Sequence, residues 1–242
     1  MIKYVIQHIV PVCLQRLAAI PRSAILFSPA VLSVTLSMGI LVSSILAGAA
    51  NPVAPGSPDL DSRIQRFLDR NRSEWSDWNV PYQDGKVLHD LILKNRYTRA
   101  LEIGTSTGHS AIWMARALAR TGGRLITIEI DEERYREALS NFKKAGVDHL
   151  IDARLGDAHA LVKELPGPFD FVFSDADKEW YTQYFKDLEP KLVKGGCFTA
   201  HNVSHPYGDI KRFLEYVRSL PQYETTIDRT SSSGISISYK RK

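Results

Sequence analysis

Between residues 99 and 219 the sequence alternates short apolar runs with amphipathic stretches, and this alternation limits the fold more than any other feature. The apolar runs are "RALEIGT", "RLITIEI", "IDARLGD", "FDFVFSD" and "GGCFTAHNV". Helix-period segments separate them, among them "HSAIWMARALA" and "DEERYREALSNFKKAG". Strands that alternate with helices of this length predict an α/β fold with a doubly wound, mainly parallel sheet. Two consecutive strand patterns at the end, "YETTIDR" and "GISISYKRK", predict an antiparallel hairpin at one edge.

The segment before this pattern has a different composition. Residues 1–50 carry only three charges, and residues 24–47 form an apolar stretch of about the length that spans a bilayer. We therefore expect a hydrophobic leader over 1–50, either a signal peptide or a membrane anchor. Its basic amino-terminal side predicts a membrane-anchored or exported protein, with the side of the membrane left open. Residues 51–59 are typical of a Pro/Gly/Ser linker, and 60–242 are predicted to form one folded domain.

Charge and cysteine usage exclude two classes of function. The net charge is +4, but three positive charges lie in the leader, which leaves about +1 for the rest of the chain. We therefore predict no nucleic-acid surface. The two cysteines, Cys13 and Cys197, show neither a CxxC nor a Cys/His zinc spacing, so no disulfide framework or zinc site is predicted. Cys197 lies on an apolar strand and is expected to be a small core residue.

A loop with two glycines, "EIGTSTGHS", follows the first predicted strand. Gly104 and Gly108 are four residues apart, which is not the GxGxxG spacing of a nicotinamide-dinucleotide site. A glycine there lets the backbone approach a ligand, and the helix that follows favours negative charge at its start. Glu129 comes 25 residues after Gly104, at the end of the second predicted strand. A carboxylate at that place can accept both hydroxyls of a ribose, although a solvated strand-end carboxylate would look the same.

Polar side chains also follow the later strands. In "FVFSDADKEWY", Asp175 and Asp177 follow the apolar run, and Lys178 comes directly after Asp177; in "GGCFTAHNVSH", His201 and Asn202 follow the apolar run. Carboxylates and an amine at a crevice rim are costly to arrange unless they meet cations or each other. For Asp177 alone, the cap of a helix is a sufficient explanation. His201 could be a metal ligand, a proton carrier or a packed residue.

Five segments in this order resemble the cation-dependent S-adenosylmethionine O-methyltransferases, the group of the catechol and caffeoyl-CoA O-methyltransferases. They are "LEIGTSTGHS", "TIEID", "KKAGVDHLIDARLGDA", "FDFVFSDADKEWY" and "GGCFTAHNV". The resemblance implies the class I methyltransferase fold, a Rossmann-like sheet of seven strands whose last strand is antiparallel. It also implies S-adenosylmethionine as cofactor. The positions that match the family's cofactor-binding residues are Val80, Glu102, Gly104, Thr105, Ser110, Glu129, Ala158 and Asp177.

The resemblance further implies a metal site and a base. Asp175 matches the family's first metal ligand, and Lys178 matches the lysine assigned as general base. The second and third ligands are an Asp-Asn pair in the family, whereas this chain has His201 and Asn202. A neutral imidazole lowers the expected affinity for Mg²⁺ or Ca²⁺ and suits Mn²⁺, Fe²⁺ or Zn²⁺ better. The alternative is that no metal binds and His201 acts as the base.

From this resemblance we expect an enzyme, an S-adenosylmethionine-dependent O-methyltransferase. It would act on a hydroxyl of a small, catechol-like aromatic acceptor, with a divalent cation left open. A metal-independent enzyme with His201 or Lys178 as base, and a membrane-tethered cofactor-binding protein without activity, are the alternatives. The short link "SHPYGD" leaves the identity of the acceptor open. The expected partners are that acceptor and, through the leader, a membrane; homodimerisation stays open and no nucleic acid is expected.

Overall fold

A short helix opens the part of the chain that the structure describes. The structure is a computed structural model, and it describes residues 57–75 and 78–241. Helix α3 (Pro58–Arg70) begins two residues before the expected start of the domain, since Ser57 Oγ accepts a hydrogen bond from Leu60 N at 3.2 Å and a proline stands in the first helical position. The predicted leader, and residues 51–56 of the predicted linker, lie outside the described residues.

The localisation that we predicted from the leader is contradicted. Within residues 57–75 and 78–241, no helix is both long and apolar enough to cross a membrane. We therefore correct the prediction of a membrane-anchored or exported protein. The segment on which that prediction was based, residues 1–50, lies outside the described residues.

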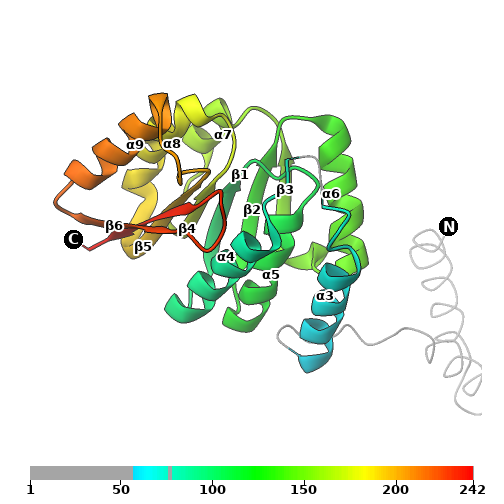
Figure 1. The fold of residues 1–242 in the computed structure, drawn as a ribbon. Coiled ribbons are helices and arrows are strands. Elements are labelled where there is room, and N and C mark those ends of the chain that lie inside the picture. Colours follow the sequence, from blue (N-terminus) through cyan, green and yellow to red (C-terminus); the bar gives the residue numbers. More distant parts are fainter. Residues whose placement is uncertain (1–56, 76–77, 242) are drawn as a thin grey trace, which may run out of the picture. The chain divides into compact units, whose positions relative to one another are not determined.

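Seven strands form one sheet, as the resemblance implied (Figure 1). Their order across the sheet is β3-β2-β1-β4-β5-β7-β6, and β7 runs antiparallel to both of its neighbours while the other pairs are parallel. The strands are β1 (Arg99–Ile103), β2 (Arg124–Glu129), β3 (Ile151–Leu155), β4 (Phe169–Ser174), β5 (Leu192–His201), β6 (Tyr223–Asp228) and β7 (Ile235–Lys240). The terminal hairpin is confirmed, with the last strand inserted between β5 and the edge strand β6.

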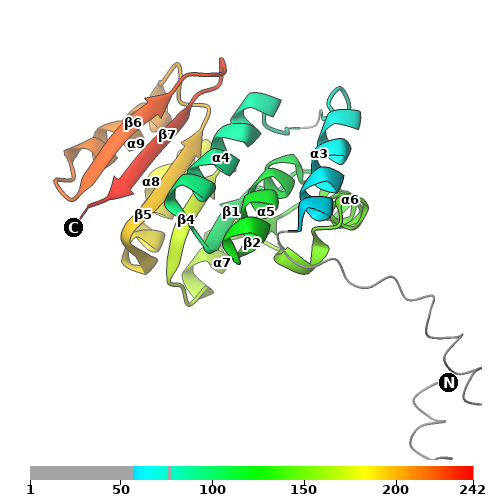
Figure 2. The same ribbon diagram turned by 90° about the horizontal axis from the view of Figure 1, so that it is seen from below.

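Helices cover both faces of the sheet, which makes the doubly wound arrangement that the alternation predicted (Figures 1 and 2). Apolar residues of α3, α4, α5 and α6 pack against one face, and those of α7, α8 and α9 pack against the other. The helices after α3 are α4 (Tyr82–Asn95), α5 (His109–Thr121), α6 (Glu132–Ala145), α7 (Ala158–Glu164), α8 (Tyr181–Leu188) and α9 (Gly208–Ser219). Three 3₁₀ turns, Asp148–Leu150, Lys178–Trp180 and Glu189–Lys191, join them to the strands.

Successive strand residues point to opposite faces, so each central strand serves both halves of the core. In β4, Phe171 and Phe173 belong to the core on the α4–α5 side, whereas Val172 belongs to the core on the α8–α9 side. Cys197 is fully buried in β5, as predicted. The strand order reverses between β1 and β4, which is where open α/β sheets bind ligands outside the carboxyl ends of their strands.

Candidate functional site

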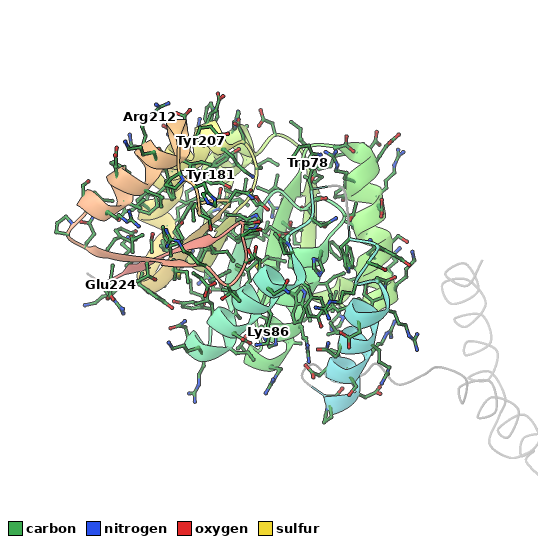
Figure 3. All side chains as sticks on the ribbon, in the orientation of Figure 1. Trp78, Lys86, Tyr181, Tyr207, Arg212 and Glu224 are labelled. Atoms are coloured by element: carbon green, nitrogen blue, oxygen red, sulfur yellow. The ribbon has the colours of Figure 1, made fainter. Side chains whose placement is uncertain are left out.

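Two adjoining cavities of about 220 and 370 Å³ lie at the carboxyl ends of β1, β2 and β4. They share five lining residues: Gly104, Glu129, Ile130, Ala176 and Asp177. The smaller cavity extends toward Ala158 and His159, and the larger one toward Asp175, Lys178 and Trp78. Trp78 is 82 % exposed, and Figure 3 labels it beside the central strands. Six of the predicted site residues therefore line one connected hollow: Gly104, Glu129, Ala158, Asp175, Asp177 and Lys178.

Gly104 directly follows β1 and packs against the residues that follow β4, at the base of both cavities. Its φ of +93° is a conformation that residues with a side chain rarely adopt. A Cβ added there would lie 3.1 Å from both the backbone nitrogen and the Cβ of Ala176. Glycine therefore allows this loop to lie close against Ala176, which lines both cavities as well.

The Glu129 carboxylate is held in a fixed position by the backbone around it. Its Oε2 accepts a hydrogen bond from Ser106 N at 2.7 Å, and its Oε1 accepts bonds from Ile130 N and Asp131 N at 3.0 Å each. Three donors of this kind hold the carboxylate in one orientation. Oε2 has a further lone pair, so it can accept a hydrogen bond from a hydroxyl group of a ligand in the cavity.

Three other predicted cofactor residues lie behind the cavity and do not line it. Glu102 is fully buried, and its two oxygens accept hydrogen bonds from Ser110 Oγ and Thr127 Oγ1 at 2.5 Å each. Thr105 joins this network through the Thr127 hydroxyl. Burial raises the pKa of Glu102 to about 8, against the opposing effect of the two hydroxyl donors. The network stiffens the Gly104 loop from below and adds little net charge.

Val80, the most loosely aligned of the predicted residues, also lies away from the two cavities. Its side chain is buried, and its carbonyl oxygen lies 2.9 Å from His109 Nδ1. It therefore ties the segment before α4 to the start of α5.

The side of the hollow near Ala158 contains a residue that the sequence did not indicate. His159 Nε2 lies 2.9 Å from Asp177 Oδ2, and the His159 ring stacks on Trp180 with centroids 3.6 Å apart. The contact orients the Asp177 side chain, whose own backbone has a φ of 33°. No sequence pattern marks His159, because its two partners come from a different loop.

At the other side, three side chains from two strand ends converge. Lys178 Nζ donates to Asp175 Oδ1 at 2.7 Å and to the Asp175 carbonyl oxygen at 3.1 Å. His201 Nδ1 lies 3.1 Å from Asp175 Oδ2, and this nitrogen is buried without a hydrogen-bond partner. The structure thus brings Asp175, Lys178 and His201 together, although His201 is only 3 % exposed and lines neither cavity.

His201 is also in contact with a second carboxylate. Its Nε2 lies 2.8 Å from Oδ2 of Asp84, a residue of α4 that sequence reasoning missed. Burial opposes a charge on the imidazole, but Asp175 and Asp84 outweigh it and raise the pKa of His201 to about 9. Without a bound metal, the two carboxylates therefore favour the imidazolium form of the ring.

The predicted metal ligands are a mixed set of donors. Among residues 57–75 and 78–241, no group of three or more His, Cys, Asp or Glu side chains is arranged to hold a metal ion. Asp175 Oδ2 and His201 Nδ1 nevertheless lie 3.1 Å apart, and the exposed Asn202 follows His201 in the chain. One carboxylate, one imidazole and one amide fit a borderline transition-metal ion and do not suit Mg²⁺ or Ca²⁺.

Comparison with known sequences points to one family. The model of a family described as O-methyltransferase matches residues 60–210. A catechol O-methyltransferase of Niastella koreensis is 43% identical over 129 residues, which are 52% of this chain and 58% of that protein. Caffeoyl-CoA O-methyltransferase 1 of Arabidopsis thaliana is 31% identical over 69% of this chain and 68% of its own length. The chain spans less than two thirds of the first of these relatives.

Solved structures agree with the sequence comparison. An O-methyltransferase from Bacillus cereus, in complex with SAH, is 26% identical, with a TM-score of 0.64 over 83% of this chain and 97% of that one. The O-methyltransferase TomG from Streptomyces achromogenes, in complex with SAM, is 27% identical, with a TM-score of 0.64 over 85% of this chain and 96% of that one. Both likenesses extend over most of the part of the chain that folds into the sheet and its helices.

Proposed function

The chain belongs to the O-methyltransferase family, and on this premise we propose that it transfers a methyl group from S-adenosylmethionine to a hydroxyl of a small aromatic, catechol-like acceptor. The single observation that carries the proposal is the connected hollow formed by the two cavities, at the point between β1 and β4 where the strand order reverses. A seat for a nucleoside, formed around Glu129, opens there into a side that holds Asp175 and Lys178.

The cofactor half of the proposal rests on Gly104 and Glu129. Glu129 has a lone pair on Oε2 for a ribose hydroxyl, and the smaller cavity continues from it to Ala158, where an adenine would lie. Gly104 lies at the base of both cavities. Asp177, held by His159, borders both cavities and would contact the same ligand. Glu102, Thr105, Ser110 and Val80 would support the cofactor by holding the loops beneath and beside it.

The acceptor half rests on the side of the hollow toward Asp175. Methyl transfer from a sulfonium is an in-line displacement, so the enzyme must hold the acceptor oxygen behind the methyl group. A phenol is mostly protonated at neutral pH, since its pKa is about 10, and the displacement needs that proton to leave. Lys178 borders the larger cavity, and its amine can take the proton of a bound acceptor when it is in the neutral form, becoming the ammonium that Asp175 pairs with. Asp175 positions the Lys178 amine through the 2.7 Å contact.

A metal ion remains part of the proposal as a site for a transition metal. Asp175, His201 and Asn202 would hold it, and when bound it would favour the phenolate form of an acceptor hydroxyl. These ligands are the reason to expect little preference for Mg²⁺.

Two measurements test the proposal in sequence. Calorimetry with S-adenosylhomocysteine should show binding at one site per chain. Turnover with methyl-labelled cofactor should then place the label on a catechol-type acceptor from a panel that includes simple phenols, amines and carboxylic acids. Running the panel with a chelator and with individual metals assigns the metal role. Binding without transfer to any hydroxyl acceptor would refute the proposed reaction.

A further inference from the structure

Asp84 is a carboxylate inside the folded domain that the proposed reaction does not yet use. It lies in the first turn of α4 and is completely buried. Its Oδ2 accepts a hydrogen bond from Ser231 Oγ at 2.7 Å and lies 2.8 Å from His201 Nε2, while Oδ1 has no hydrogen-bond partner. Burying a carboxylate is costly unless its partners compensate. One of these partners is His201, the position at which this chain departs from the family's metal-binding pair.

The backbone of His201 is fixed, so the contact with Asp84 determines how the ring is presented. His201 is the last residue of β5 and pairs with Ile235 of β7. Its carbonyl oxygen accepts a hydrogen bond from Tyr181 Oη at 3.2 Å. With Nε2 directed at Asp84, Nδ1 is the nitrogen that faces Asp175 Oδ2 at 3.1 Å. A ring turned over by half a turn would place Cδ2 toward Asp175 and Cε1 toward Asp84, so neither carboxylate would face a ring nitrogen.

Asp84 is in turn held from a third segment. Ser231, in the connection between β6 and β7, donates to Asp84 and accepts hydrogen bonds through the same Oγ from Ser233 N and Gly234 N. The carboxylate therefore joins α4, the end of β5 and the terminal hairpin at one buried point. Such a joint is rigid enough to keep an imidazole in one orientation.

We propose that Asp84 is a positioning residue of the site, which holds Nε2 of His201 and thereby presents Nδ1 toward Asp175 and the acceptor side. This inference rests on the proposed function, and it applies whether Nδ1 binds a metal ion or only the Asp175 carboxylate that borders the larger cavity. A carboxylate on one imidazole nitrogen fixes the role of the other, and the loss of such a partner typically reduces metal affinity or activity 10- to 100-fold.

The main variant is Asp84→Leu, which keeps a side chain of similar size and removes both acceptors. We expect kcat to fall roughly 10- to 100-fold, with the Kd for S-adenosylhomocysteine within about twofold of the wild type. Asp84→Asn, which keeps one acceptor oxygen, should lose less, and it carries the test if the Leu variant does not fold. The matched control is Asp90→Asn. Asp90 lies on the same helix and contacts a different histidine, His89, at 2.8 Å, outside the two cavities.

A double-mutant cycle distinguishes positioning from a general structural role. In a His201→Gln background, whose amide can still bond to a carboxylate, Asp84→Leu should change kcat less than about twofold, because the ring on which it acts is gone. Equal losses in both backgrounds would overturn the proposal. So would a folded Asp84→Leu variant that retains wild-type kcat.

The NMR signals of the His201 ring nitrogens can be measured without methyl-transfer activity. The ¹⁵N signals of His201, assigned through the His201→Gln variant, should shift in Asp84→Leu and stay unchanged in Asp90→Asn. Unchanged signals in Asp84→Leu would overturn the positioning role. If the wild type transfers no methyl group, the proposed function fails, and these signals still decide whether Asp84 orients His201.

Discussion

The replacement of Glu129 by glutamine tests the cofactor seat most sharply. The change keeps the size of the side chain but turns one carboxylate oxygen into an amide that cannot accept. Three backbone N–H groups point at this carboxylate, at 2.7, 3.0 and 3.0 Å. The amide nitrogen faces a backbone donor in either orientation. The orientation that opposes only one donor, Ser106 N, puts the nitrogen at the Oε2 position, where it cannot accept from the ribose. A hydrogen bond to a charged group contributes about 1.5–3 kcal/mol, so losing one should raise the Kd for the cofactor roughly 10- to 150-fold.

The assay is calorimetric titration with S-adenosylhomocysteine, accompanied by thermal unfolding without ligand. The melting curve shows whether Glu129→Gln is folded at the temperature of the titration. Glu132→Gln is the matched control, since Glu132 begins α6 three residues later and pairs with Arg136 at the surface. Its Kd should stay within about twofold of the wild type. A folded Glu129→Gln variant with a Kd changed less than about threefold would refute the assignment of this carboxylate to the cofactor.

Further predictions concern Gly104, the proposed base and the buried histidine. Gly104→Ala and Gly122→Ala both force a side chain into a positive φ (+93° and +77°), so each should lower Tm by roughly 2–8 °C. Only the first should weaken cofactor binding, because Gly104 lines both cavities and Gly122 lines neither. Equal Kd values for the two variants would contradict a role of Gly104 in the cofactor site. Lys178→Met should lower kcat about 10²- to 10⁴-fold with an unchanged cofactor Kd, whereas the control Lys186→Met, at an exposed position, should leave kcat unchanged. Steady-state turnover compares the two variants. A Lys178→Met enzyme with wild-type kcat would exclude the Lys178 amine as the base. Burial disfavours a charge on His201, but the neighbouring carboxylates outweigh this effect and raise its pKa from 6.5 to about 9. The stability that the charged ring contributes to the folded protein is therefore complete below about pH 6.5 and is lost as the pH rises through about 9. The Tm difference between wild type and His201→Gln, measured with a chelator present, should shrink across that range; a constant difference contradicts the charged pair.

Most of the fold followed from the sequence because its pattern is local. Each strand is a short apolar run, and each helix has its apolar residues at helical spacing, so neither needs information from elsewhere in the chain. The antiparallel hairpin was visible as two strand patterns without a helix between them. The insertion of β7 between β5 and β6 was implied only through the family, because strand order depends on contacts between distant segments.

The site was predicted where its residues lie at strand ends, and missed where a contact joins distant segments. Glu129 and Asp175 each end a strand pattern, so their meeting at one edge of the sheet could be expected. Asp84 is 117 residues from His201, and nothing in the spacing connects them. A weak signal was present, since Asp84 occupies the same helical face as the buried Leu88 and Ile92, where an apolar residue is expected. A carboxylate on that face indicates a buried partner but does not identify it.

The central claim is that the hollow formed by Gly104, Glu129, Asp175 and Lys178 transfers a methyl group to a hydroxyl. The most direct test is turnover of a catechol with cofactor carrying a ¹³C-labelled methyl group, with the product identified by NMR and mass spectrometry. We expect one labelled methyl group on a ring oxygen of the product, and we expect Lys178→Met to form this product at least about 100-fold more slowly than the wild type. A wild type that binds S-adenosylhomocysteine but methylates no hydroxyl, or a label on nitrogen or carbon, would contradict the central claim.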